Sequence, residues 1–169
     1  MSAPGSEPGS APGSALRAAM MGVHERLDAM FAAQQRALLD RDFVRAGAWL
    51  DRYRAGLLLH MDDEEQHVLP LYAARGGGDA SDAPVKLFLG EHARMREFVA
   101  RSVAAIAALQ QQPDDRALLA LFDQQATYKN LLLHHDLRER NALYPRVEQW
   151  ADAGELQALA AVVRSPGAA

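Results

Sequence analysis

The chain has 169 residues, of which 49% are hydrophobic and 24% are charged, and this predicts one domain with a core of its own. Because it contains no cysteine, disulfides, thiolate zinc sites, iron–sulfur clusters and a thiol nucleophile are excluded. The formal net charge of -4 is spread over interspersed acidic and basic residues, so we expect no nucleic-acid partner. Neither a secretory signal nor an apolar run of membrane-spanning length is visible, and we expect a cytoplasmic protein with no membrane partner.

The order of elements can be predicted along the chain. Residues 1–14 repeat an Ala-Pro-Gly-Ser unit without a core-forming residue, so we expect a disordered tail. From Ala15 onward, apolar residues recur every three or four positions among good helix formers, which predicts helices and no strands. Breaks at Asp42, at residues 76–84 and at Asp114 separate long helices over 16–39, 43–75, 84–111 and 115–149, followed by a shorter amphipathic segment at 154–164.

Short connections between long helices predict antiparallel neighbours. We therefore expect an all-α fold for residues 15–165. Its architecture would be an up-down-up-down four-helix bundle with a short extra C-terminal helix.

The second and fourth predicted helices contain an internal duplication at an offset of 75 residues. The segments are YRAGLLLHMDDEEQHVLP, from Tyr53, and YKNLLLHHDLRERNALYP, from Tyr128. Both copies carry His and Glu four positions apart, as His60 with Glu64 and as His135 with Glu139. Such residues lie one turn apart on one helix face, with Cβ atoms about 5–6 Å apart, so both side chains can reach one metal cluster.

The first and third predicted helices each add one histidine. A bundle of this kind can bring four imidazoles and two carboxylates to one level of its core. These donors suit first-row metals, and two bridging carboxylates can hold a pair about 3.5–4 Å apart. The mixed nitrogen and oxygen set favours iron over zinc and leaves manganese open. The predicted metal ligands are His24, His60, Glu64, His92, His135 and Glu139.

The order His, His-x-x-x-Glu-Glu, His, His-x-x-x-Glu, closed by Leu-Pro or Tyr-Pro, resembles the hemerythrin and HHE cation-binding family from about His24 to Tyr144. The resemblance implies a centre of two Fe ions bridged by both glutamates and by an oxo or hydroxo group. It implies small ligands such as O2, NO or peroxide, or a role in handling iron itself. It further implies that one iron is held by His24 and His135, and the other by His60 and His92.

Two positions depart from the oxygen-carrying members of that family, which have a fifth histidine and an aspartate in the last ligand helix. Arg96 stands four residues after His92, and Arg140 stands five residues after His135. The chain is closer to the subset with four histidines and two glutamates. Members of that subset are described as acting in sensing, nitric oxide response or iron-centre repair. The departure disfavours simple reversible oxygen carriage.

Other polar residues near the predicted ligands have more ordinary interpretations. His67 lies two turns from His60, about 10.5 Å away, which is too far to share its metal, and His134 faces about 100° from His135. We expect a solvated acidic face formed by Asp62, Asp63 and Glu65. Carboxylates that could accept from imidazole N–H groups are Glu91, Glu97 and Asp28. Tyr53 and Tyr128 are expected to be core residues with hydrogen-bonded hydroxyls.

The sequence leaves several functions open. The leading hypothesis is a di-iron protein that binds or senses O2, NO or peroxide and is not an enzyme. The same ligands could serve iron-centre repair, iron donation or oxygen storage. A ferritin-like ferroxidase needs the Glu-x-x-His motif on two helices. The chain has this motif only at Glu64 and His67, because the residue three positions after Glu139 is Ala142. A metal-free helical interaction module leaves the duplicated pairs unexplained.

Overall fold

The computed structural model describes residues 12–76 and 83–164, and all regular elements within these ranges are helical. The first half consists of α1 (Pro12–Leu39), α2 (Phe43–Asp63), the π-helical turn η1 (Glu64–Val68) and α3 (Leu69–Gly76). The second half consists of α4 (Ala83–Gln111), α5 (Asp115–Arg138), the π-helical turn η2 (Glu139–Leu143), α6 (Tyr144–Trp150) and α7 (Ala153–Val162). Residues 1–11 of the predicted tail lie outside the described residues, and α1 begins at Pro12 instead of residue 16.

Aspartate caps determine where three of the helices begin. Asp42, Asp114 and Asp152 each accept a hydrogen bond from the backbone N–H three residues further on. Such a cap satisfies one of the free N–H groups of a first helical turn. In α7 the cap is reciprocal, because Glu155 accepts a bond from the backbone N–H of Asp152. The predicted starts of α2 and α5 are therefore confirmed.

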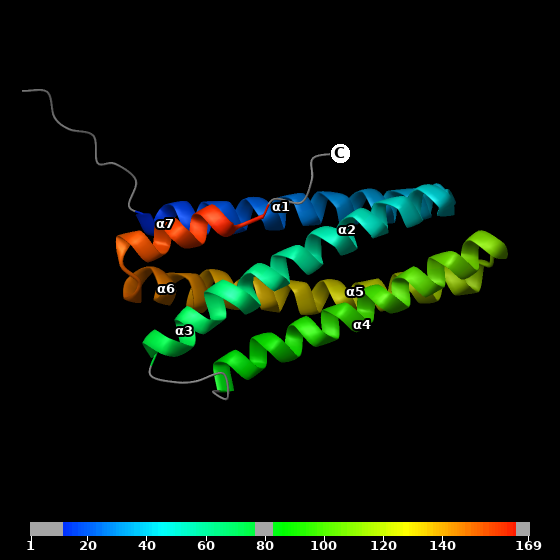
Figure 1. Ribbon diagram of the computed structural model, residues 1–169. Coiled ribbons are helices and arrows are strands. Elements are labelled where there is room, and N and C mark those ends of the chain that lie inside the picture. The colour runs from blue at the N-terminus through cyan, green and yellow to red at the C-terminus, as the bar shows by residue number, and fades with distance from the viewer. Residues whose placement is uncertain (1–11, 77–82, 165–169) are drawn as a thin grey trace, which may run out of the picture.

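The long helices pack side by side along much of their length (Figure 1). α1 packs against α2, α2 against α4, and α4 against α5. α7 packs back onto α1, and α6 contacts both α1 and α3. No helix in the described ranges is both long and apolar enough to cross a membrane.

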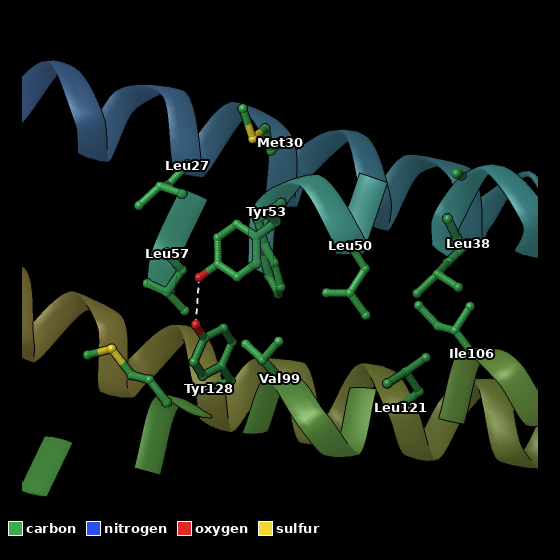
Figure 2. Packing of buried hydrophobic residues seen from close by; sticks show 14 of the residues in the cluster. Leu27, Met30, Leu38, Leu50, Tyr53, Leu57, Val99, Ile106, Leu121 and Tyr128 are labelled. Atoms are coloured by element: carbon green, nitrogen blue, oxygen red, sulfur yellow. Dashed lines mark hydrogen bonds between the residues drawn. The ribbon is translucent and has the colours of Figure 1, made fainter. Parts of the chain in front are cut away.

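Two apolar clusters lie on either side of the predicted ligands. On α1, His24 stands between Met20 of one cluster and Leu27 of the other. On α4, His92 stands between Phe88 and Met95 in the same manner. Part of the larger cluster is shown in Figure 2. The part of the helices that carries the predicted ligands is thus enclosed by apolar packing on both sides.

In the larger cluster, the hydroxyls of Tyr53 and Tyr128 share a hydrogen bond of 2.5 Å (Figure 2). Both rings are buried. The expectation that these tyrosines are core residues with hydrogen-bonded hydroxyls is confirmed.

The two π-helical turns are features that the sequence analysis did not predict. They begin at Glu64 and Glu139, the two glutamates of the duplicated motif. The N–H of Leu69 donates to the carbonyl of Glu64, and the N–H of Tyr144 donates to that of Glu139. The next residue in each copy is a proline, which has no N–H and whose ring clashes with the carbonyl four residues before it. A widened turn relieves this conflict, and such turns are frequent at functional sites.

Candidate metal centre

The structure brings all six predicted ligand residues together in two groups that share Glu139. The donor atoms within each group lie within 4.8 Å of one another. The larger group, called the four-donor group below, consists of Glu64, His92, His135 and Glu139. The smaller group, called the three-donor group, consists of His24, His60 and Glu139. All these residues except the slightly exposed His24 are buried.

This grouping of donor atoms differs from the pairing that the family resemblance implied. His24 lies with His60, with their Nε2 atoms 2.8 Å apart. His92 lies with His135, with ring centroids 4.9 Å apart. The reason is the order of the helices, because α1 packs against α2 and α4 packs against α5.

Glu64 lies between the two groups. Its Oε2 is 3.3 Å from Nε2 of His92 and 3.7 Å from Nε2 of His60. Its other oxygen accepts a hydrogen bond of 2.6 Å from the hydroxyl of Tyr144, which is fully buried. One carboxylate oxygen is therefore held by the protein, and the other faces an imidazole of each group.

Glu139 is placed in the same way. Its Oε2 is 3.3 Å from Nε2 of His24, and its Oε1 is 2.5 Å from Nε2 of His135. Neither oxygen has a partner in hydrogen-bond geometry, although both are buried, and the same is true of Nε2 of His92. Leaving buried polar atoms unpaired costs free energy. A metal pair would satisfy these inward-facing atoms, so the residues fit the metal that their chemistry implies.

Carboxylates hold three of the four imidazoles from behind. Each accepts a hydrogen bond from an Nδ1–H, at 2.6 Å for His24 with Asp136, 2.8 Å for His92 with Glu65 and 2.9 Å for His135 with Glu91. Such a bond turns Nε2 toward the centre and raises its basicity as a ligand. Nδ1 of His60 is buried and has no partner.

Each of these carboxylates is in turn bound by an arginine. Arg96 donates to Glu65 at 2.8 Å and Arg140 donates to Asp136 at 2.9 Å. Arg138 binds Glu91 through two nitrogens. Arg96 and Arg140 thus fix two of the three carboxylates that orient the histidines.

The expectations about neighbouring acidic residues are partly confirmed. Glu91 accepts from an imidazole as expected. Glu97 pairs with Arg101 instead, and among the described residues Asp28 forms no hydrogen bond with an imidazole. The sequence does not point to Asp136, because nothing in it shows that this residue faces a histidine on another helix.

The interpretation of Asp62, Asp63 and Glu65 as a solvated face is wrong for two of these residues. Asp63 is 2% exposed and accepts bonds from the backbone and the guanidinium of Arg164. Glu65 binds His92 and Arg96. Only Asp62 keeps a substantially exposed side chain, and it also binds Arg164.

Burial and mutual attraction set the pKa values of the metal-free centre. Burial lowers the pKa of His60 to about 4, although the charge of Glu64 opposes this. Burial also disfavours the charged forms of His24 and His135, yet nearby carboxylates outweigh it and raise both pKa values. Burial raises the pKa of Glu139, whereas for Glu64 the surrounding imidazoles outweigh burial and lower the pKa. A metal that binds here must therefore displace protons.

A cavity of about 370 Å³ reaches the centre. Its lining includes His24, His135 and Asp136. Most of the remaining wall is apolar and is formed by residues such as Leu27, Phe31, Tyr53, Leu57, Met95 and Leu132. The cavity offers an apolar path to one side of the metal centre.

The remaining histidines stay outside the centre. His67 and His134 belong to neither donor group among the described residues. His134 is exposed, although it is adjacent to His135. The structure therefore separates the histidines as the duplicated spacing predicted.

Residues 15–147 match the family described as the hemerythrin HHE cation binding domain. No curated protein and no solved structure matches the chain.

Proposed function

The chain belongs to the hemerythrin HHE cation-binding family, and from this premise we propose that it is a di-iron protein that binds or senses O2, NO or peroxide. Its buried histidine and glutamate cluster fits a metal-binding protein. The observation that carries the di-iron proposal is the position of Glu64 and Glu139, each of which lies near an imidazole of both donor groups. This is the arrangement that two carboxylates bridging a metal pair require.

The bundle that we propose to hold this centre has four antiparallel members in up-down-up-down order. They are α1, the continuous unit from α2 to α3, α4, and the unit from α5 to α6. The support is that consecutive members pack against each other and that α1 and α4 connect to the next helix by short turns. α7 would be the additional C-terminal helix.

In this proposal, the chain itself has three tasks. The four imidazoles and two carboxylates hold the metals, the carboxylates behind the imidazoles keep Nε2 directed inward, and the hydroxyl of Tyr144 holds Glu64 in position. When bound, an iron pair supplies redox chemistry and open coordination positions for small ligands. The apolar cavity lets a small uncharged molecule approach while limiting access of water.

Sensing is favoured over oxygen carriage because, in the part of the chain that the structure describes, neither donor group contains a fifth imidazole. Arg96 and Arg140 are engaged with carboxylates and cannot serve as metal ligands. A carrier needs one closed metal and one open metal in a dry pocket, so that O2 is returned intact. With neither iron saturated by protein donors, we expect the reduced protein to be oxidised by O2.

Iron analysis combined with optical spectra tests the proposal. Protein purified without added metal should hold two irons per chain and show the charge-transfer absorption of a bridged ferric pair. The reduced protein should oxidise in air within minutes, fail to recover on argon purging, and give a stable new spectrum with NO. Less than two irons at saturation would overturn the di-iron proposal, and a coloured oxygen adduct that disappears on purging would overturn sensing in favour of carriage or storage.

A further inference from the structure

We infer that the two metal positions are unequal: the position in the four-donor group fills first and retains its metal, and the position in the three-donor group fills last and exchanges its metal. This inference rests on the proposed di-iron function. It goes beyond that function because it assigns different tasks to the two halves of one centre.

The number of donors is the first observation. Glu64, His92, His135 and Glu139 lie mutually within 4.8 Å, whereas only His24, His60 and Glu139 satisfy the same condition on the other side. Glu64 approaches the three-donor group less closely, at 3.7 Å from His60 against 3.3 Å from His92. A position with fewer donors within reach binds its metal more weakly.

The support behind the imidazoles is the second observation. In the four-donor group, both histidines donate through Nδ1 to a carboxylate, and an arginine binds each carboxylate. In the three-donor group, only His24 has this support, because Nδ1 of His60 is buried without a partner. Removing such a partner typically lowers metal affinity about 10–100-fold. The three-donor group lacks one of these partners, because no carboxylate supports His60.

Access is the third observation. The side chain of His24 is 11% exposed, against 6% or less for the other three histidines. Its partner Asp136 is 26% exposed, and the carboxylates behind the histidines of the four-donor group are 6% exposed at Glu91 and 27% exposed at Glu65. The cavity wall contains His24 and Asp136 together, and His135 from the other group. His24 is thus the most exposed of the four donor imidazoles, so exchange of a metal starts more readily at the three-donor group.

The consequence is a populated form with a single metal. When metal is scarce, the four-donor position would be filled and the three-donor position empty. Loading of the second position would then follow the supply of metal, and the metal bound there is the one that the protein could donate.

Titration of the metal-free full-length chain with Co2+ tests the inference, with visible absorption and calorimetry as readouts. We expect two equivalents whose dissociation constants differ about 10–100-fold, and a chelator that removes the weaker one first. Two equivalents of equal affinity, or cooperative loss of both, would overturn the inference and leave the proposed function standing. A total below two equivalents would overturn both.

Two variants assign the binding steps to their groups. Glu91→Gln neutralises the partner of His135 and should weaken only the tighter step. Asp136→Asn neutralises the partner of His24 and should weaken only the second step. Glu97→Gln is the matched control, because this residue pairs with Arg101 away from the centre and should alter neither step.

The opposite assignment would overturn the inference, as would equal weakening of both steps by either variant. Circular dichroism and thermal unfolding establish that each variant is folded. Glu65→Gln tests the tighter position independently through His92 if Glu91→Gln is unstable.

Discussion

Replacing Tyr144 with phenylalanine removes one hydroxyl from the centre and keeps the packing of the ring. This hydroxyl donates to Glu64 over 2.6 Å. Tyr144 is fully buried and Glu64 is 1% exposed, so water cannot replace the lost donor. Burial and the charges of Glu139 and Glu64 raise the pKa of Tyr144 well above its usual value, which keeps it protonated and able to donate.

The magnitude follows from the charge on the acceptor. A hydrogen bond to a charged group contributes about 1.5–3 kcal/mol, and a buried acceptor left without its donor incurs a cost of that order. We therefore expect Tyr144→Phe to lower the unfolding free energy of the metal-free protein by about 1.5–3 kcal/mol. For a domain of this size each kcal/mol lowers Tm by roughly 2–4 °C, which gives a decrease of roughly 3–12 °C.

Urea and thermal unfolding in the presence of a chelator measure this effect. Tyr72→Phe is the matched control, because the hydroxyl of Tyr72 accepts from Arg146, whose side chain is exposed and can bind water instead. The control should change the unfolding free energy by no more than about 0.5 kcal/mol. Equal stability of Tyr144→Phe and the wild type, or an equal loss in both variants, would refute the reasoning.

Three further predictions concern the ligands, the charges and the C-terminal segment. His135→Ala should reduce iron well below two per chain, whereas His134→Ala should leave it unchanged; iron analysis distinguishes them, and full retention in His135→Ala would remove that residue from the ligand set. In the metal-free protein, burial holds the pKa of His60 at about 4, so its imidazole should still be neutral at pH 5 in an NMR titration. Because the unfolded chain takes up this proton near pH 6.5, His60 should make the fold lose stability as the pH falls from about 6.5 toward 4, and a protonated ring at pH 5 would contradict this. Arg164→Ala removes the side-chain bonds to Asp63 and should speed proteolysis after α7, while an unchanged cleavage rate would show that these bonds do not retain the segment.

The sequence alone predicts the long helical segments and the six histidines and glutamates that the structure brings together. Helix starts depend on local hydrogen bonds, such as the one that the side chain of Asp42 accepts from a backbone N–H three residues away. Such bonds can be predicted from residues that are close together in the sequence. The duplicated His-x-x-x-Glu spacing is equally local, because it places two side chains on one helix face. The predicted family is confirmed by the match over residues 15–147.

The π-helical turns were indicated by the sequence only in part. The prolines that follow Leu69 and Tyr144 were visible in both copies of the motif. Their effect on the preceding turn was not predicted, because a proline within a helix can produce a kink, a break or a widened turn. Which of these occurs depends on the packing of the continuing helix.

Only the tertiary structure decided how the six residues are grouped and supported. Whether His24 lies beside His60 or beside His135 depends on which helices are neighbours. The bond from His24 to Asp136 joins residues 112 positions apart. The spacing of residues along one helix specifies which face they share, whereas the order and rotation of helices in a bundle arise from packing between distant segments, and these determine which side chains meet across the core.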